Sequence, residues 1–239
     1  MNDKKIKLNL YAHLLEFLVK NKPYSPAQLS QDLFVLYFTE MKKNGFFVEI
    51  GATDGFYLSN TFLLENKQNW NGIVSEPLTR WHEKLKKNRN CKIDTRCVFS
   101  KSNLKLNFCD VYDYPEFSGL TDEIEKDNNS KLREKYNKIE VKTVSINDLF
   151  EEHKAPSYID YISIDTEGSE YKILEQLNFK KYNVGIFTIE HNFMEEKREK
   201  INNFLTKRNY TRVFERISKW DDWYIQQDNK ILKKFLLTS

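Results

Sequence analysis

The sequence predicts an α/β fold with a mostly parallel sheet that is covered by helices on both faces. From Gly45 onward, short apolar segments of strand length alternate with segments of helix length. This alternation is typical of parallel strands joined by helices. Near the end of the chain, two strand-like segments are separated by only a few residues, which indicates an antiparallel hairpin at one edge of the sheet.

Ahead of this alternation, the sequence predicts two helices. Apolar residues recur at helical spacing over residues 6–20. A second helix is expected to begin after Ser25, which suits an N-cap, because Pro26 fits the first helical position and Gln28 has the spacing of a capping box. Together these helices predict an N-terminal helical extension over residues 1–44.

The rest of the chain, residues 45–239, is expected to form one domain, since neither an internal repeat nor a low-complexity linker divides it. The expected strands are 45–51, 72–76, 92–100, 158–165, 184–190, 210–217 and 222–227. The expected helices are 58–66, 78–88, 169–177 and 194–208. The last two strands form the predicted hairpin.

Residues 101–143 interrupt this rhythm and predict an insertion over one edge of the sheet. A strand is expected at 105–113, followed by a glycine-kinked loop that leads into a highly charged helix within 117–138. The charge run is typical of a solvated face, although insertions of this kind often carry substrate contacts. The chain is expected to return to the sheet over residues 139–150.

Composition and charge exclude several classes of protein. Hydrophobic residues make up 40% of the chain, so it is expected to fold, and a net charge of +3 gives no electrostatic case for binding nucleic acid. Neither a membrane span nor a signal peptide is expected, and a cytoplasmic protein follows by default. The three cysteines, Cys91, Cys97 and Cys109, are spaced unlike a zinc site and predict free thiols.

The first strand ends in a turn between two of the chain's seven glycines, Gly51 and Gly55. A strand, a glycine-rich turn and a helix place free backbone N–H groups at the ligand crevice of an open α/β sheet. A dinucleotide site favours G-x-G-x-x-G without nearby carboxylates, whereas this turn contains Asp54 and follows Glu49. These acids favour a ligand with positive charge and hydroxyls, with an ordinary strand-to-helix turn as the alternative.

The second strand ends at Glu76, 25 positions after Gly51, and Pro77 follows it. An acid about 20 positions after such a turn is the expected ribose anchor, because its carboxylate accepts hydrogen bonds from two vicinal hydroxyls. Alone, an acid at this place is more often a helix N-cap or a surface residue. The glycine turn ahead of it favours the ligand role.

Acidic residues also end a later strand. Asp165 is followed by Glu167 and Glu170, and three carboxylates within six residues are costly to cluster unless solvent, a cation or helix N–H groups compensate. Asp165 falls at the crevice, whereas Glu170 suits the dipole of the next helix.

The strand at 184–190 ends in Glu190, and His191 and Asn192 follow. Because the carboxyl ends of neighbouring parallel strands meet at one edge of a sheet, Asp165, Glu190 and His191 are expected to converge. A histidine beside an acid is either a general base with a tuned pKa or a metal ligand.

Taken together, these motifs resemble those of the FkbM-type S-adenosylmethionine-dependent methyltransferases. The resemblance runs from about Gln31 through the final hairpin, and its most specific parts are EIGATDG, IDTEGSE and IEHN in that order. Thr53 departs from the asparagine most often expected there but keeps a small polar group. The resemblance implies a Rossmann-like class I methyltransferase, with a seven-stranded, mostly parallel sheet and an antiparallel C-terminal hairpin.

The resemblance also implies S-adenosylmethionine as the cofactor. Its methionine carboxylate and sulfonium are expected over the turn from Gly51 to Gly55, its ribose hydroxyls at Glu76, and its adenine near Val98, Phe99 and Ser100. The cofactor-binding residues expected in this way are Glu49, Gly51, Thr53, Asp54, Gly55, Ser59, Asn60, Glu76, Pro77, Phe99, Ser100 and Asp165.

The family is associated mainly with O-methylation. We therefore expect methyl transfer to a hydroxyl of a sugar, a glycan or a glycan precursor, with a small natural product as the alternative acceptor. An alcohol is a poor nucleophile near neutral pH, so a base or a metal that lowers its pKa is expected. The expected catalytic residues are Asp165, Glu167 and His191. The expected ligands of a Mg²⁺ or Mn²⁺ ion are Asp165, Glu190, His191 and Asn192.

Three rival functions fit the sequence less well. Many nucleic-acid methyltransferases carry a D/N-P-P-Y/F-like turn after the fourth strand, but the segment from Asp165 to Gly168 has neither proline nor aromatic residue. A nicotinamide oxidoreductase would need fingerprint glycines that are out of register here. A catalytically silent cofactor-binding module would keep Glu76 but lose the acids after the later strands.

Several aromatic residues leave two interpretations open. They either pack in the core, which is the commoner role, or form a wall on which a sugar stacks. These residues are Tyr112, Tyr114, Phe117, Trp220 and Trp223.

Overall fold

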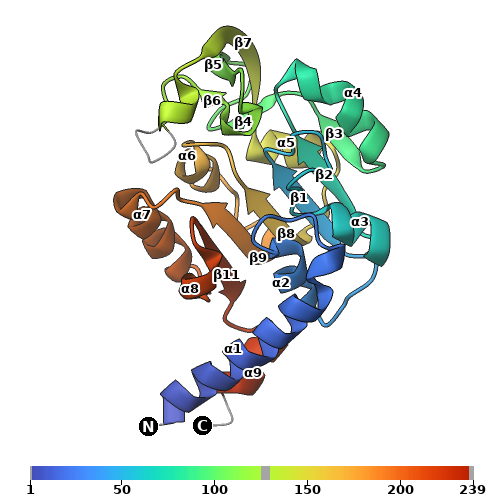
Figure 1. Cartoon of the computed structure of the whole chain (residues 1–239), viewed down its shortest axis with the longest axis vertical. Coiled ribbons are helices and arrows are strands. Elements are labelled where there is room, and N and C mark those ends of the chain that lie inside the picture. The colour runs from blue at the N-terminus through green and yellow to red at the C-terminus, as the bar shows by residue number, and fades with distance from the viewer. Residues whose placement is uncertain (1, 125–129, 237–239) are drawn as a thin grey trace.

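In the computed structural model, which describes residues 2–124 and 130–236, the chain forms a seven-stranded sheet between layers of helices (Figure 1). The strand order is β10-β11-β9-β8-β1-β2-β3. The strands are β1 (Phe46–Ile50), β2 (Asn71–Ser75), β3 (Lys92–Asp94), β8 (Tyr158–Ile164), β9 (Asn183–Glu190), β10 (Tyr210–Val213) and β11 (Asp221–Gln226). Within this sheet β11 alone runs against its neighbours. The predicted mostly parallel sheet and C-terminal hairpin are confirmed.

Helices cover both faces of the sheet because neighbouring strand residues point to opposite sides. Val48 and Ile162 pack in one core with α5, α6 and α7, whereas Phe47 and Tyr161 pack in the other with α1 to α4. The helices are α1 (Asn2–Asn21), α2 (Gln31–Phe38), α3 (Phe62–Gln68), α4 (Thr79–Asn88), α5 (Ile146–Glu152), α6 (Glu170–Leu174), α7 (Glu195–Thr206), α8 (Glu215–Ser218) and α9 (Lys230–Leu236). Among the described residues, no helix has the length and apolar character needed to cross a membrane.

The second N-terminal helix begins later than the sequence predicts. α2 starts at Gln31, and Ser25 instead follows a short 3₁₀ helix, η1 (Lys22–Tyr24). The Ser25 hydroxyl donates a hydrogen bond to Asp32 Oδ1 at 2.6 Å, within α2. It therefore does not cap the N-terminus of a helix that begins at residue 26. Ser30 then turns the chain into the helix with φ +65°. The predicted start at Ser25 is wrong because this longer-range contact replaces the local capping pattern.

The insertion forms a second sheet, with strand order β4-β7-β5-β6. Its strands are β4 (Cys97–Phe99), β5 (Lys105–Val111), β6 (Gly119–Leu120) and β7 (Tyr136–Ser145), with the short 3₁₀ helices η2 (Pro115–Phe117) and η3 (Ser130–Arg133) between them. In Figure 1 these green strands lie above the main sheet. The single strand expected at 92–100 is divided between the two sheets, with a break at Arg96, whose guanidinium contacts Asp94 Oδ2 at 2.6 Å.

The charged helix expected within residues 117–138 is not found where the chain is described. From Tyr136 the chain is already the strand β7, which pairs antiparallel with β5. Residues 125–129 of the expected segment lie outside the described residues. Buried Val141 alternates with exposed Glu140 and Lys142, which is the period-two pattern of a strand with one solvated face. The return to the main sheet expected at 139–150 is wrong for the same reason.

Candidate functional site

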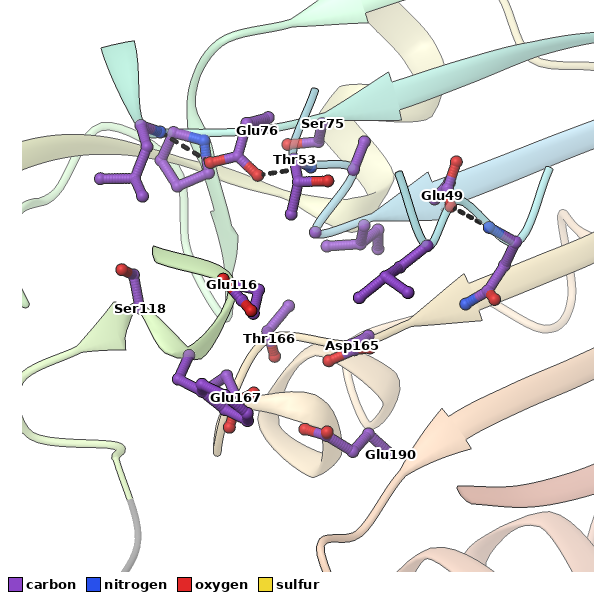
Figure 2. Close-up of a pocket in the computed structure, with 18 of the residues that line it drawn as sticks. Glu49, Thr53, Ser75, Glu76, Glu116, Ser118, Asp165, Thr166, Glu167 and Glu190 are labelled. Carbon is purple, nitrogen blue, oxygen red and sulfur yellow. Dashed lines mark hydrogen bonds between the residues drawn. The ribbon is translucent and has the colours of Figure 1, made fainter. Parts of the chain in front are cut away.

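A cavity of about 270 Å³ opens at the carboxyl edge of the main sheet, where β1, β2, β8 and β9 end (Figure 2). The second sheet contributes the opposite wall, mainly through residues 115–120. The two sides are in close contact at Gly119, where a Cβ would lie 3.2 Å from both Glu167 Cβ and the Thr166 carbonyl oxygen. The cavity therefore lies between the main sheet and the insertion.

The two glycines of the first turn have different structural roles. Gly51 has φ +90°, and a Cβ there would lie 1.8 Å from the Asp165 carbonyl oxygen, so the ends of β1 and β8 approach closely only with glycine at this position. Gly51 also lines the cavity. Gly55 has φ +78° and faces away from the cavity lining, toward the side chains of Leu85 and Arg89.

Glu76 and Asp54 both stabilise the turn by accepting hydrogen bonds from backbone N–H groups. Glu76 Oε2 accepts from Thr53 at 2.9 Å and Oε1 from Leu78 at 2.8 Å. Burial raises the pKa of Glu76 to about 7, although both hydrogen bonds favour its charged form. Asp54 lies on the exposed side of the turn, outside the cavity lining, where its Oδ1 accepts from Phe56 at 2.9 Å.

Glu49 is buried beneath the turn and is hydrogen-bonded within the protein. Its carboxylate accepts from the Ser59 hydroxyl at 2.9 Å, the Asn60 backbone N–H at 2.6 Å and the Thr61 hydroxyl at 2.6 Å. Arg89 forms an ion pair with it at 3.1 Å. Ser59 and Asn60 line the cavity beside Glu49. Sequence reasoning missed Arg89, because a basic residue after a helix rich in lysine carries no distinguishing signal.

Of the three residues expected near adenine, Val98 lines the cavity, whereas Phe99 and Ser100 do not. Cys97, also of β4, and Pro77 line the cavity as well. Burial raises the pKa of the Cys97 thiol to about 12, so this thiol is neutral at physiological pH. All three cysteines are free thiols, as predicted.

Asp165, Glu167 and Glu190 form an acidic cluster on the other side of the cavity (Figure 2). One carboxylate oxygen of each lies within 4.8 Å of those of the other two. Glu167 forms an ion pair with Arg133 of η3 and accepts from Asn192 Nδ2 at 3.1 Å. The Glu190 side chain lines the cavity, and its buried Oε2 has no hydrogen-bond partner among the described residues.

Burial, and after it the charge of neighbouring acids, raises most of the pKa values in this region. Burial, and then the charge of Glu170, raise the pKa of Asp165 to about 7. Burial, and then Asp165, raise the pKa of Glu190 well above its ordinary value, and the same two causes raise the pKa of Asp221 to about 8. Burial also opposes ionisation of Glu170, but the Lys197 ammonium at 3.1 Å and backbone N–H groups outweigh it and lower its pKa.

His191 lies outside this cluster and outside the cavity lining. Its Nδ1 accepts from the Phe193 backbone N–H at 3.0 Å, which places the proton of the neutral ring on Nε2, 3.8 Å from Asp222 Oδ1. Burial lowers the pKa of His191, so the ring is neutral at physiological pH. The expected convergence of Asp165 and Glu190 is found, but Glu167 occupies the place expected for His191.

The aromatic candidates divide between the cavity and the core. Phe117 and Trp220 line the cavity, whereas Trp223 is fully buried and stacks on Phe34 with ring centroids 4.4 Å apart. Tyr112 and Tyr114 are exposed and lie outside the lining. Lining residues that the sequence did not single out include Tyr57, Leu58, Gln31, Glu116 and Ser118. Gln31, Glu116 and Ser118 gave no signal because their segments reach the cavity only through long-range packing, whereas Tyr57 and Leu58 lie between the predicted Gly55 and Ser59 but have no residue type that marks a site.

A family model described as Methyltransferase FkbM domain matches residues 49–212. No curated protein matches the chain. Among solved structures, the chain is similar to a precorrin-6y C5,15-methyltransferase from Geobacter metallireducens GS-15, at 9% identity over 76% of this chain and 72% of that chain, with a TM-score of 0.43.

Two further solved structures show a similar degree of likeness. One is a methyltransferase from Pyrococcus furiosus, at 14% identity over 91% of this chain and 96% of that chain, with a TM-score of 0.42. The other is the plantazolicin methyltransferase BpumL in complex with SAH, at 12% identity over 99% of this chain and 85% of that chain, with a TM-score of 0.39. At identities and TM-scores this low, nothing about the activity of this chain follows from them.

Proposed function

The chain belongs to the FkbM methyltransferase family, and from this we propose that it transfers the methyl group of S-adenosylmethionine to a hydroxyl of a sugar, a glycan or a glycan precursor. The observation that most supports this proposal is the placement of two kinds of acid around one cavity. Glu76 follows the end of β2, and a second group of acids lies at the ends of β8 and β9. The first suits a ribose, and the second suits an acceptor that must lose a proton.

The cofactor is proposed to lie across the ends of β1 and β2. Its methionine part would lie over Gly51 and Thr53, its ribose at Glu76, and its adenine between Leu78 and Val98. The Glu76 carboxylate already accepts two backbone N–H groups. An ionised carboxylate has about four lone-pair sites, so two remain for the vicinal ribose hydroxyls.

The acceptor is proposed to lie beside Asp165 and Glu167. Its hydroxyl oxygen attacks the methyl carbon, the new C–O bond forms as the C–S bond breaks, and the sulfonium leaves as a neutral thioether. Holding the two reactants in line supplies several kcal/mol of the barrier. Asp165 is the proposed acceptor of the hydroxyl proton because it is partly exposed into the cavity, whereas the His191 ring faces Asp222.

Calorimetric titration with S-adenosylmethionine and S-adenosylhomocysteine tests the first half of the proposal, and formation of S-adenosylhomocysteine with sugar, glycan and natural-product acceptors tests the second. Glu76→Gln is expected to weaken cofactor binding. Asp165→Asn is expected to keep binding and lose transfer. If neither cofactor form binds at millimolar concentration, the proposal is overturned. Binding without transfer to any acceptor would support the silent module instead.

A further inference from the structure

The acidic cluster at the ends of β8 and β9 has the composition of a cation site. We propose that Asp165, Glu167 and Glu190 bind a divalent cation that prefers oxygen ligands, such as Mg²⁺, Mn²⁺ or Ca²⁺. Carboxylate oxygens are the ligands such hard cations select. Binding of the ion stands on the cluster itself, whereas its catalytic role rests on the proposed methyl transfer.

The geometry of the cluster fits a single ion. Ca²⁺ binds oxygen at about 2.3–2.6 Å and Mg²⁺ at about 2.0–2.1 Å, so two oxygen ligands of one ion lie at most about 5 Å apart around Ca²⁺ and about 4 Å apart around Mg²⁺. One oxygen of each of the three side chains falls within 4.8 Å of the others. The cluster also combines a strand end with the loop after another strand, and Asn192 fixes Glu167 at 3.1 Å. The separation of the three oxygens thus fits Ca²⁺ as it stands, whereas Mg²⁺ would draw them closer together.

An unpartnered oxygen supplies a second, independent argument. Glu190 is 5% exposed and lines the cavity, yet its Oε2 has no hydrogen-bond partner among the described residues. In Figure 2 its carboxylate points toward Asp165 and Glu167. A buried acceptor without a partner is energetically unfavourable, and more so when it is charged. A cation at the centre of the cluster would satisfy this oxygen.

Such an ion would also narrow the class of acceptor. An octahedral ion with three protein ligands keeps three positions for other oxygens. Two adjacent oxygens of one acceptor, such as the vicinal hydroxyls of a sugar, can fill two of them. Held by Asp165, Glu167 and Glu190, such an ion would lower the pKa of an acceptor hydroxyl, and Asp165 would accept the proton that this hydroxyl loses as its oxygen takes the methyl group.

The binding of the ion can be tested without an acceptor. The full chain is treated with EDTA, dialysed and titrated with Mn²⁺ under electron paramagnetic resonance, and with Mg²⁺ and Ca²⁺ in a calorimeter. Glu190→Gln is expected to raise the dissociation constant for Mn²⁺ at least about tenfold, the size of effect seen even for outer-shell groups. Glu116→Gln is the matched control, because it removes the same charge from the same cavity outside the cluster, and its effect is expected to stay below about threefold.

Two outcomes overturn the cation site: no binding of any of the three ions at millimolar concentration, or equal affinity in Glu190→Gln and the unaltered protein. Titration of the same preparation with S-adenosylhomocysteine separates this result from the fate of the proposed function. Cofactor binding without the ion removes the cation site alone, and ion binding without the cofactor removes the methyl transfer alone. If Glu190→Gln fails to fold, which its melting temperature in EDTA reports, Asp165→Asn takes its place.

Discussion

Glu76 is the residue whose ionisation is expected to control cofactor affinity. Its pKa of about 7 lies within the range of ordinary assays. Because hydroxyls donate more strongly to a carboxylate than to a carboxylic acid, the dissociation constant for S-adenosylmethionine is expected to be about tenfold larger at about pH 6 than at about pH 8. Calorimetry at the two pH values measures this ratio.

Two other titratable groups lie close to Glu76. His82 Nε2 contacts the Glu76 carbonyl oxygen at 2.9 Å, and the Cys97 thiol, with a pKa of about 12, stays neutral throughout. Glu76→Gln should therefore abolish most of the pH dependence, and a variant that keeps it would assign the effect elsewhere. The stability of the unliganded protein is expected to change in the opposite direction with pH. Because the folded state binds the Glu76 proton more tightly than the unfolded state, the contribution of Glu76 to the free energy of unfolding falls as the pH rises from about 4.5 to about 7.

The two glycines of the first turn are expected to differ in their tolerance of alanine. At Gly51 a Cβ would lie 1.8 Å from a backbone oxygen that has little freedom to move, whereas at Gly55 the nearest atom, at 2.6 Å, is a methyl group of the flexible Leu85 side chain. Both positions have positive φ, which costs about 1–3 kcal/mol for a residue with a Cβ. Gly51→Ala is therefore expected to lose more free energy of unfolding in urea than Gly55→Ala. Equal losses would contradict the close approach of β1 and β8.

At the scale of single elements, Arg89, the residue that follows α4, supports the turn from Gly51 to Gly55. This buried side chain pairs with Glu49 at 3.1 Å and Glu65 at 2.5 Å, and donates to the Thr61 hydroxyl at 2.8 Å. Arg89→Met would leave Glu49 charged, buried and without its cation, so it is expected to lose about 3–5 kcal/mol in urea unfolding. The double variant Arg89→Met, Glu49→Gln is expected to recover part of this loss. A double variant no more stable than Arg89→Met would show that charge is not the cause.

Single elements also show which predictions local patterns support. β1, β2, β8 and β9 were found within two residues of their expected ends, because each is a short apolar run bounded by glycine or acidic residues. The start of α2 and the presence of the strand β7, where a charged helix was expected, were predicted wrongly. Both depend on contacts distant in sequence, from Ser25 to Asp32 and from β7 to β5. A highly charged segment such as 130–142 offers a helix and a half-exposed strand similar local support, and tertiary pairing decides between them.

At the scale of the whole molecule, the two sheets are held together beside the acidic cluster. Gly168, in the loop after β8, has φ +129°, and a Cβ there would lie 1.9 Å from the Glu123 carbonyl oxygen of the insertion. Lys172 also pairs with Glu123 at 2.7 Å. Gly168→Ala should force this contact apart and shift Glu167. Methyl transfer is expected to fall at least about tenfold, since small misplacements of reacting groups are costly, while cofactor affinity changes little.

Gly119→Ala serves as the comparison for this variant. It lies at the same contact between the sheets, but the nearest atom to a Cβ there is 3.1 Å away. Its effect on transfer is expected to be smaller. Calorimetry with S-adenosylhomocysteine measures cofactor affinity, and a turnover assay measures methyl transfer. If Gly168→Ala lost cofactor affinity as strongly as transfer, the proposed division of the cavity into a cofactor side and an acceptor side would be contradicted.

The same division explains how much of the site the sequence could reveal. Glu76, Asp165 and Glu190 follow or end strands of the main sheet, and strand order brings such positions together, so they were identifiable in advance. Glu167 was also predicted, as a catalytic residue, but its position in the cluster where His191 was expected could not be foreseen, because it depends on the turn after β8, where Glu167 takes φ +57°. The wall formed by Glu116, Phe117 and Ser118 was also hidden, since it exists only after the second sheet folds over the first.

The way in which the second sheet reaches the cavity bears on how acceptor preference can be redesigned. Apart from β4 and one residue of β5, its contribution comes from a single short stretch, residues 115–120, whereas the main-sheet lining is dispersed over many segments. A combinatorial library confined to this stretch leaves Gly51, Glu76 and the acidic cluster unchanged. Residues 115–120 can therefore be varied in the search for new acceptors while the residues proposed to bind the cofactor keep their identity.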